Sequence, residues 1–61
     1  MKTRILIADD HRMVRHGIRV LLEADPSLQV IAEADDGITA VKLAEEHRPE
    51  LAIVDVGMPG I

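Results

Sequence analysis

Residues 3–10 read TRILIADD, a short apolar run that two aspartates stop abruptly. A run of about four to eight such residues, bounded by polar ones, is typical of a buried strand, so we expect a strand over Thr3–Ala8. Two further runs follow it, LQVIAEA at residues 28–34 and ELAIVDV at residues 50–56. The last run is apolar at successive positions, which is typical of a parallel strand that helices cover on both faces.

The segments between these runs have helical periodicity. Between His11 and Ala24 the apolar and charged side chains separate onto opposite sectors at about 100° per residue, as in an amphipathic helix. Asp10 is the expected N-cap of this helix. Asp36 is expected to cap a second helix that ends before Pro49, because proline cannot continue a helix.

The order strand–helix–strand–helix–strand predicts an α/β fold. Right-handed crossovers between successive strands give a parallel sheet, with the two helices on one or both of its faces. All 61 residues fit in one domain, and we expect no second domain and no internal repeat. Because only residues 57–61 follow the third run, we expect the unit to be the first half of a larger domain.

Composition excludes several classes of protein. The sequence has no cysteine, which excludes disulfide frameworks and thiolate metal sites. No apolar run reaches the roughly 18 residues that cross a bilayer, and the first run is too short for a signal peptide, so we expect a cytoplasmic protein without membrane contact. A net charge of −4 and the absence of aromatic residues argue against direct nucleic-acid binding by this segment.

Three aspartates lie where strands are expected to end. Asp9 and Asp10 come directly after the first strand, and Asp55 lies near the end of the third. Ligands of open α/β sheets bind beyond the carboxyl ends of the strands, and a strand order of 2-1-3 would make the first and third strands neighbours. The three carboxylates would then meet at one edge, where their repulsion raises their pKa values or recruits a cation. Oxygen ligands without cysteine or clustered histidine favour Mg²⁺, and an aspartate beside such an ion can act as a nucleophile toward phosphorus.

These residues stand in motifs that resemble a known family. The strand ILIA followed by DDH at residues 9–11, then DG at residues 36–37 and DVGMPG at residues 55–60, is similar to the amino-terminal half of a bacterial response-regulator receiver domain. The nearest subgroup is the NarL/FixJ, or LuxR, type, and the resemblance covers essentially the whole chain. It implies a flavodoxin-like, CheY-like half-domain with parallel strands in order 2-1-3, truncated before strands 4 and 5.

The resemblance also implies roles for individual residues. Asp55 would accept a phosphoryl group from a sensor histidine kinase. Mg²⁺ would be held by three carboxylates and one backbone carbonyl, those of Asp9, Asp10, Asp55 and Gly57. Met58 and Pro59 would shape the loop after the phosphorylation site. The parent protein would be a DNA-binding transcription regulator of a two-component system.

The sequence departs from the family pattern in its second half. A complete receiver has a fourth strand that ends in Ser or Thr and a fifth that brings a Lys and an aromatic switch residue. The only lysines here are Lys2 and Lys42, neither at the end of a strand facing Asp55, and no aromatic residue is present. We therefore expect a phospho-accepting receiver rather than an enzyme, with self-phosphorylation and dephosphorylation impaired.

Several other residues have plainer interpretations. We interpret the charged sector of the first helix as a solvated face, with docking of a kinase-side partner as the alternative. This sector contains Arg12, Arg15, His16 and Arg19. Gly17 is expected to allow close packing of the helix on the sheet. His11 is expected to flank the acidic site, His47 to lie near the negative end of the second helix, and Met58 to fill the core.

The third strand would lie at an edge of the sheet, with no Lys, Pro or bulge signal to protect it before Asp55. We expect it to pair with the same strand of a second copy, which gives a homodimer through residues 50–56. Two functions of different classes stay open. One is a receiver segment that binds Mg²⁺ and accepts a phosphoryl group; the other is a self-associating structural module that no longer signals. A Mg²⁺-dependent phosphohydrolase has less support, because no acid–base residue is visible.

Overall fold

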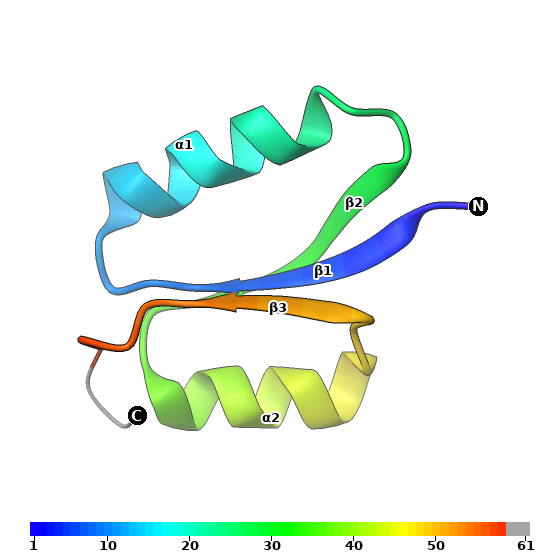
Figure 1. The fold of residues 1–61 in the computed structure, drawn as a ribbon. Helices are drawn as coiled ribbons and strands as arrows, with labels where there is room; N and C mark the ends of the chain where they lie inside the picture. The colour runs from blue at the N-terminus through cyan, green and yellow to red at the C-terminus, as the bar shows by residue number, and fades with distance from the viewer. Residues whose placement is uncertain (59–61) are drawn as a thin grey trace.

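Three parallel strands lie between two helices in the computed structural model, which describes residues 1–58 (Figure 1). The elements are, in chain order, β1 (Thr3–Ala8), α1 (Arg12–Glu23), β2 (Leu28–Ala34), α2 (Gly37–His47) and β3 (Leu51–Val54). The predicted α/β order is confirmed. Figure 1 shows α1 on one face of the sheet and α2 on the other, which decides between the two arrangements that the sequence left open.

The sheet has the order β2-β1-β3, as predicted. β1 is the central strand and pairs in parallel with both of its neighbours. Its last residue, Ala8, is level with Ala34 at the end of β2 and with Val54 at the end of β3. The chain therefore leaves β1 and β3 at the same end of the sheet.

The core lies around β1, because this strand has a neighbour on each edge and a helix on each face. Its last four residues are buried, and Ile5 and Ile7 are fully enclosed. Full burial of one such side chain contributes about 1.5–3 kcal/mol. Met58 is also buried, in a cluster with three alanines, Ala8, Ala34 and Ala40. Its predicted place in the core is confirmed, and it ties the segment after β3 to the end of the sheet.

The two helices begin differently. α2 begins as predicted, with Asp36 as its N-cap and the Asp36 carboxylate accepting a hydrogen bond from the Thr39 amide at 2.7 Å. This bond lowers the pKa of Asp36, because it stabilises the charged form. The prediction that Asp10 caps α1 is wrong, since the N-cap is His11 and no side chain caps it. The His11 amide instead donates to the carboxylate of Asp9 at 2.8 Å, which stabilises the turn before the helix.

α1 buries less of its apolar sector than the sequence predicts. Among the described elements it packs against β2 and β1 and does not reach β3. Ile18 and Leu22 are half-buried, whereas Val14 is 50% exposed and Leu21 is 77% exposed. A Cβ added to Gly17 would meet open space, so the prediction that this glycine allows close packing is wrong.

The end of α2 is held by β1. His47 lies in the last turn of α2, as predicted, where a positive charge is favoured. Arg48 follows in the left-handed conformation, with φ at 47°. From β1, Arg4 donates hydrogen bonds to the backbone carbonyl oxygens of His47 at 2.6 Å and Arg48 at 3.0 Å. These bonds satisfy acceptors that the end of a helix leaves without partners.

β3 is shorter and more exposed than predicted. It covers Leu51–Val54 rather than residues 50–56, because Asp55 begins a turn in which its carbonyl oxygen accepts a bond from the Met58 amide at 3.2 Å. Leu51 is 49% exposed, and Val54 is 41% exposed. Ala52 is exposed as well and only Ile53 is half-buried, so within residues 1–58 the prediction that helices cover both faces of this strand is wrong.

Candidate functional site

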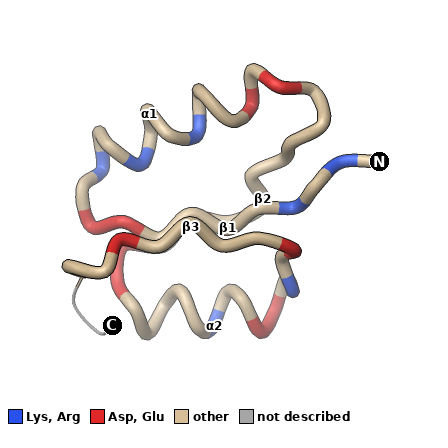
Figure 2. The backbone as a smooth tube through the Cα atoms, viewed as in Figure 1, with Lys and Arg blue, Asp and Glu red and all other residues tan. Residues whose placement is uncertain are grey.

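The carboxyl ends of β1 and β3 lead into acidic residues. The amide of Asp9 donates to the carbonyl oxygen of Ala34 at 3.0 Å, and the amide of Asp55 donates to that of Ala8 at 2.9 Å. Both aspartates therefore continue the backbone pairing of the sheet by one residue. Figure 2 shows a group of acidic positions at this end of the sheet. Parallel pairing of the strands is thus what brings the two acidic segments together.

The structure places three carboxylates and one imidazole in a single cluster. Each residue offers one ligand atom, and these atoms lie within 4.8 Å of one another; the residues are Asp9, Asp10, His11 and Asp55. Asp9 is the deepest, with 8% of its surface exposed, while the side chains of Asp10 and Asp55 are 34% and 30% exposed. Asp9 therefore lies against the sheet, whereas Asp10 and Asp55 form a rim of the cluster that is exposed to solvent.

The ring of His11 lies at this rim. Its Nδ1 atom is 3.1 Å from a carboxylate oxygen of Asp9, 2.9 Å from one of Asp10 and 3.8 Å from one of Asp55. The hydrogen bond with Asp9 and the charge of Asp10 raise the pKa of His11. The pKa of Asp9 is lowered, chiefly because its carboxylate accepts the His11 backbone amide. Hydrogen bonding therefore outweighs burial at Asp9, and the expectation that repulsion raises the pKa of this carboxylate is wrong.

A tight turn follows Asp55 and orients its carboxylate. Oδ1 accepts a hydrogen bond from the Gly57 amide at 3.0 Å, and Oδ2 lies on the side of His11. A Cβ added at position 57 would lie 3.5 Å from Oδ1, which is an ordinary contact. The turn therefore has room for a side chain where this chain has glycine. The loop role expected of Pro59 lies outside the described residues.

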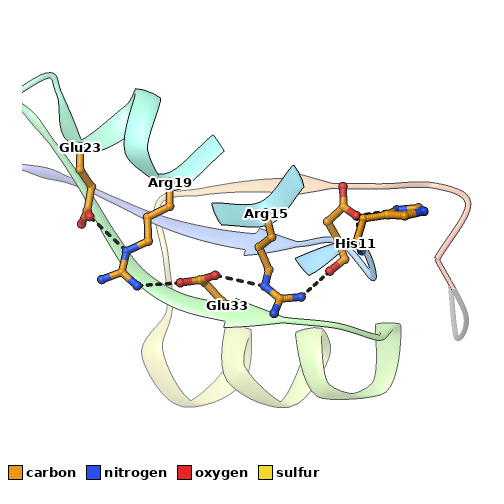
Figure 3. A network of polar contacts seen from close by, with 6 residues as sticks. His11, Arg15, Arg19, Glu23 and Glu33 are labelled. Atoms are coloured by element: carbon orange, nitrogen blue, oxygen red, sulfur yellow. Dashed lines mark hydrogen bonds and ion pairs between the residues drawn. The ribbon is translucent and has the colours of Figure 1, made fainter. Parts of the chain in front are cut away.

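An ion-pair network joins α1 to the cluster (Figure 3). Arg15 donates from Nε to a carboxylate oxygen of Glu33 on β2 at 3.1 Å, and from Nη1 to the backbone carbonyl oxygen of Asp9 at 2.7 Å. Arg19 donates to the other carboxylate oxygen of Glu33 at 2.9 Å and to Glu23 at 3.1 Å. The interpretation of this helix sector as a solvated face is wrong for Arg15, whose side chain is 17% exposed.

Sequence reasoning missed this network because helical periodicity assigns Arg15 to the charged sector. The available signal was Glu33, the one charged residue in the strand sequence LQVIAEA. A charge on a strand that a helix covers is costly unless it is paired. The crossover helix that follows β1 is the nearest source of a positive partner. The sequence could therefore have predicted that α1 pairs with Glu33, but not which arginine of the helix reaches it.

The cluster fits a hard divalent cation. Its three carboxylates supply the oxygen donors that such a cation prefers. Magnesium is commonly bound by one or two carboxylates together with water and substrate oxygens. The carboxylates of Asp10 and Asp55 are partly exposed, so water reaches them at the rim of the cluster.

A parallel sheet with an acidic cluster beyond its carboxyl ends defines a class of protein. It is an α/β fold that places a polar site where the order of the strands reverses. Comparison with known proteins then identifies the family, since residues 5–61 match the response regulator receiver domain. The chain belongs to this family.

Relatives and solved structures agree with this assignment. The chain is 47% identical over 58 residues to the transcriptional regulatory protein LiaR of Bacillus subtilis, covering 95% of this chain and 28% of LiaR. The signal receiver domain of NarL from Mycobacterium tuberculosis superposes with a TM-score of 0.95 at 40% identity, over 98% of this chain and 48% of that chain. The isolated receiver domain of RcsB from Salmonella enterica serovar Typhimurium, solved in the presence of the phosphomimetic BeF₃⁻, gives a TM-score of 0.92 at 32% identity. It covers 98% of this chain and 44% of that chain.

The predicted kinship with NarL-type regulators and the CheY-like fold are confirmed by these matches. The chain spans 28% of the length of LiaR and less than half of the two receiver structures. Among the residues that the structure describes, neither helix is long and apolar enough to cross a bilayer.

Proposed function

We propose that this chain is the receiver segment of a two-component transcription regulator and that Asp55 accepts a phosphoryl group from a sensor histidine kinase. The observation that carries the proposal is the meeting of three carboxylates at one end of the sheet, with ligand atoms within 4.8 Å. A phosphoryl acceptor needs a nucleophilic carboxylate and a cation that offsets the charge of the incoming group. The cluster supports both requirements in one place.

Mg²⁺ is the cation in this proposal, held by the carboxylates and one backbone carbonyl of Asp9, Asp10, Asp55 and Gly57. When bound, it neutralises the phosphoryl oxygens and aligns them for attack. The His11 amide orients the Asp9 carboxylate before any metal binds. Asp10 and Asp55 are more exposed, so water and a phosphoryl group can reach their carboxylates. The ring of His11 has to swing away from the rim, because its Nδ1 is within 3.1 Å of two carboxylates.

The proposed transfer forms a bond from a carboxylate oxygen of Asp55 to phosphorus. The P–N bond of the phosphohistidine donor breaks, and the leaving imidazole keeps the electron pair and takes up a proton from solvent. With acetyl phosphate as the donor, a P–O bond breaks and acetate leaves. Because the carboxylate attacks in its ionised form, Asp55 needs no general base. The bond from the Gly57 amide keeps this carboxylate oriented.

The relatives support the signalling context. LiaR is a transcriptional regulatory protein, and the receiver domain of RcsB was solved with a phosphomimetic. By this likeness the parent of the present chain is a DNA-binding regulator in the cytoplasm, and the segment described here is its phospho-acceptor rather than an enzyme. The net charge of −4 means that DNA binding would belong to another part of the parent.

The test is Mg²⁺-dependent labelling of the chain by acetyl phosphate. Intact-mass spectrometry should show slow addition of one phosphoryl group with Mg²⁺ and none after chelation by EDTA. Asp55→Asn should abolish the addition, whereas Asp35→Asn, at an exposed aspartate outside the cluster, should leave it unchanged. Labelling that persists in Asp55→Asn, or a folded wild type that is never labelled, would overturn the proposal.

We further propose that copies of this chain associate through β3. Within residues 1–58 this strand pairs with β1 alone, and its Leu51 and Val54 are partly exposed. An exposed apolar edge favours pairing with another strand, and two-fold pairing of identical strands is the simplest closed arrangement. Analytical ultracentrifugation tests this, with interference detection because the chain has no Trp or Tyr to absorb at 280 nm. We expect a compact species with the mass of two chains. A folded monomer across the concentration range would contradict this.

A further inference from the structure

We propose that Arg15 positions the acidic cluster by holding the backbone of Asp9 in place. The inference rests on the proposed function, since the cluster is the proposed Mg²⁺ site. Arg15 is a positioning residue here, because it contacts the backbone of one proposed ligand residue and no carboxylate of the cluster.

Arg15 links the loop after β1 to the neighbouring strand β2 (Figure 3). One arm of its guanidinium donates to the carbonyl oxygen of Asp9 at 2.7 Å, and Nε donates to Glu33 at 3.1 Å. The side chains of Arg15 and Glu33 are 17% and 27% exposed, so water competes weakly with this pair. A guanidinium holds its donors in one rigid plane, and the two bonds therefore fix the Asp9 carbonyl relative to β2.

The bond from Arg15 to the Asp9 carbonyl oxygen affects the orientation of Asp10 as well as that of Asp9. The amide of Asp9 already donates to Ala34, so with the bond from Arg15 both backbone polar groups of Asp9 are engaged. The carbonyl of Asp9 lies in the same rigid peptide plane as the amide of Asp10. Fixing this plane therefore fixes where the chain turns away from β1, and with it the direction of both carboxylates.

Arg19 provides a matched comparison within the molecule. It donates to the same Glu33 at 2.9 Å and to Glu23 at 3.1 Å, on the side of Glu33 that faces away from the cluster. Within the described residues Arg19 makes no hydrogen bond to the loop after β1. Removing Arg19 thus takes away ion pairs of the same network and leaves the Asp9 carbonyl held.

The first readout is Mg²⁺ affinity, measured on the 61-residue chain by NMR titration with the Asp10 and Gly57 amides as probes. Arg15→Met should weaken Mg²⁺ binding about 10- to 100-fold, the range seen when a metal ligand loses its outer hydrogen-bond partner. Arg19→Met should leave the affinity unchanged, although it removes two ion pairs. Equal Mg²⁺ affinities in Arg15→Met and the wild type would overturn the inference.

The second readout needs no metal and separates this inference from the proposed function. Without Mg²⁺, hydrogen exchange of the His11 amide, which donates to the Asp9 carboxylate, should accelerate in Arg15→Met and not in Arg19→Met. The Thr39 amide, bonded to Asp36 at the start of α2, serves as the internal reference. If the wild type binds no Mg²⁺, the proposed function fails, and His11 exchange still decides the role of Arg15.

A conservative variant covers the case in which Arg15→Met does not fold. Arg15→Lys keeps the charge, but a single ammonium group lacks the fork that reaches Glu33 and the Asp9 carbonyl together. We expect it to keep the ion pair and still accelerate exchange of the His11 amide. Full protection of this amide in Arg15→Lys would show that charge alone is sufficient and would overturn the positioning role.

Discussion

Replacing Met58 with alanine should destabilise the fold and loosen the turn after Asp55. Met58 is 3% exposed and packs among Ala8, Ala34 and Ala40. The substitution removes about three heavy atoms from the core, which costs about 2.4 kcal/mol at 0.8 kcal/mol for each methylene-sized group. The neighbouring alanines are too short to close the cavity, so the total should lie within about 2–5 kcal/mol.

Urea unfolding followed by far-UV circular dichroism measures this loss, because the chain has no Trp or Tyr to report by fluorescence. Small proteins lose about 1 kcal/mol of unfolding free energy for each molar increase in urea. A loss of about 2.4 kcal/mol therefore lowers the midpoint by about 2 M. Because so short a chain is marginally stable, all samples should contain the same concentration of sucrose, which strengthens burial.

Met13 supplies the matched control, since it is the same residue type at 88% exposure. Met13→Ala should change the unfolding free energy by no more than about 0.5 kcal/mol. Met58→Leu nearly conserves the volume and should cost less than about 1.5 kcal/mol. If Met58→Ala and Met13→Ala unfold at the same urea concentration, the packing assigned to the end of the sheet is wrong.

The remaining predictions concern α2 and the acidic cluster. The bond from Thr39 holds the pKa of Asp36 low, so its contribution to stability is present above the unfolded-state pKa and is lost as the pH falls through the folded-state pKa. Asparagine can still cap the helix, so Asp36→Asn should leave the stability at neutral pH unchanged. It should also make the urea midpoint fall less steeply as the pH is lowered, and an unchanged fall would contradict this. Mg²⁺ at ten times its dissociation constant should raise the unfolding free energy by about 1.4 kcal/mol, an increase that EDTA reverses and Asp55→Asn removes. Arg4→Met should lower the unfolding free energy by about 1 kcal/mol and speed amide exchange in the last turn of α2, because Arg4 bonds the carbonyl oxygens there. Unchanged exchange would show that these bonds do not hold the end of the helix.

The strand order and the acidic edge could be predicted from the sequence because both follow from local rules. Apolar runs that alternate with helical segments form a parallel sheet with right-handed crossovers. Residues that directly follow the strands then lie at the carboxyl end of the sheet, where ligands bind. Asp9, Asp10 and Asp55 obey that rule directly. Asp36 could be predicted in the same way, since an aspartate before a helical segment is a strong N-cap.

The contacts of α1 could not be predicted, because they depend on where this helix crosses the sheet. Periodicity sorts side chains into sectors, but it does not say which part of a sector meets a strand. Arg15 meets Glu33 because α1 lies over β2 and β1, and the same placement leaves Leu21 exposed. The start of α1 is also a tertiary effect: Asp9 still pairs with the sheet, which shifts the N-cap to His11.

The position of the phosphoryl group tests the central claim most directly. After incubation with acetyl phosphate, borohydride reduces an aspartyl phosphate to homoserine, and peptide mass spectrometry identifies the aspartate that was converted. We predict homoserine at position 55 alone, formed in the presence of Mg²⁺ and not in EDTA. Homoserine at any other aspartate, or at position 55 without Mg²⁺, would contradict the assignment of Asp55 as the phospho-acceptor of a Mg²⁺ site.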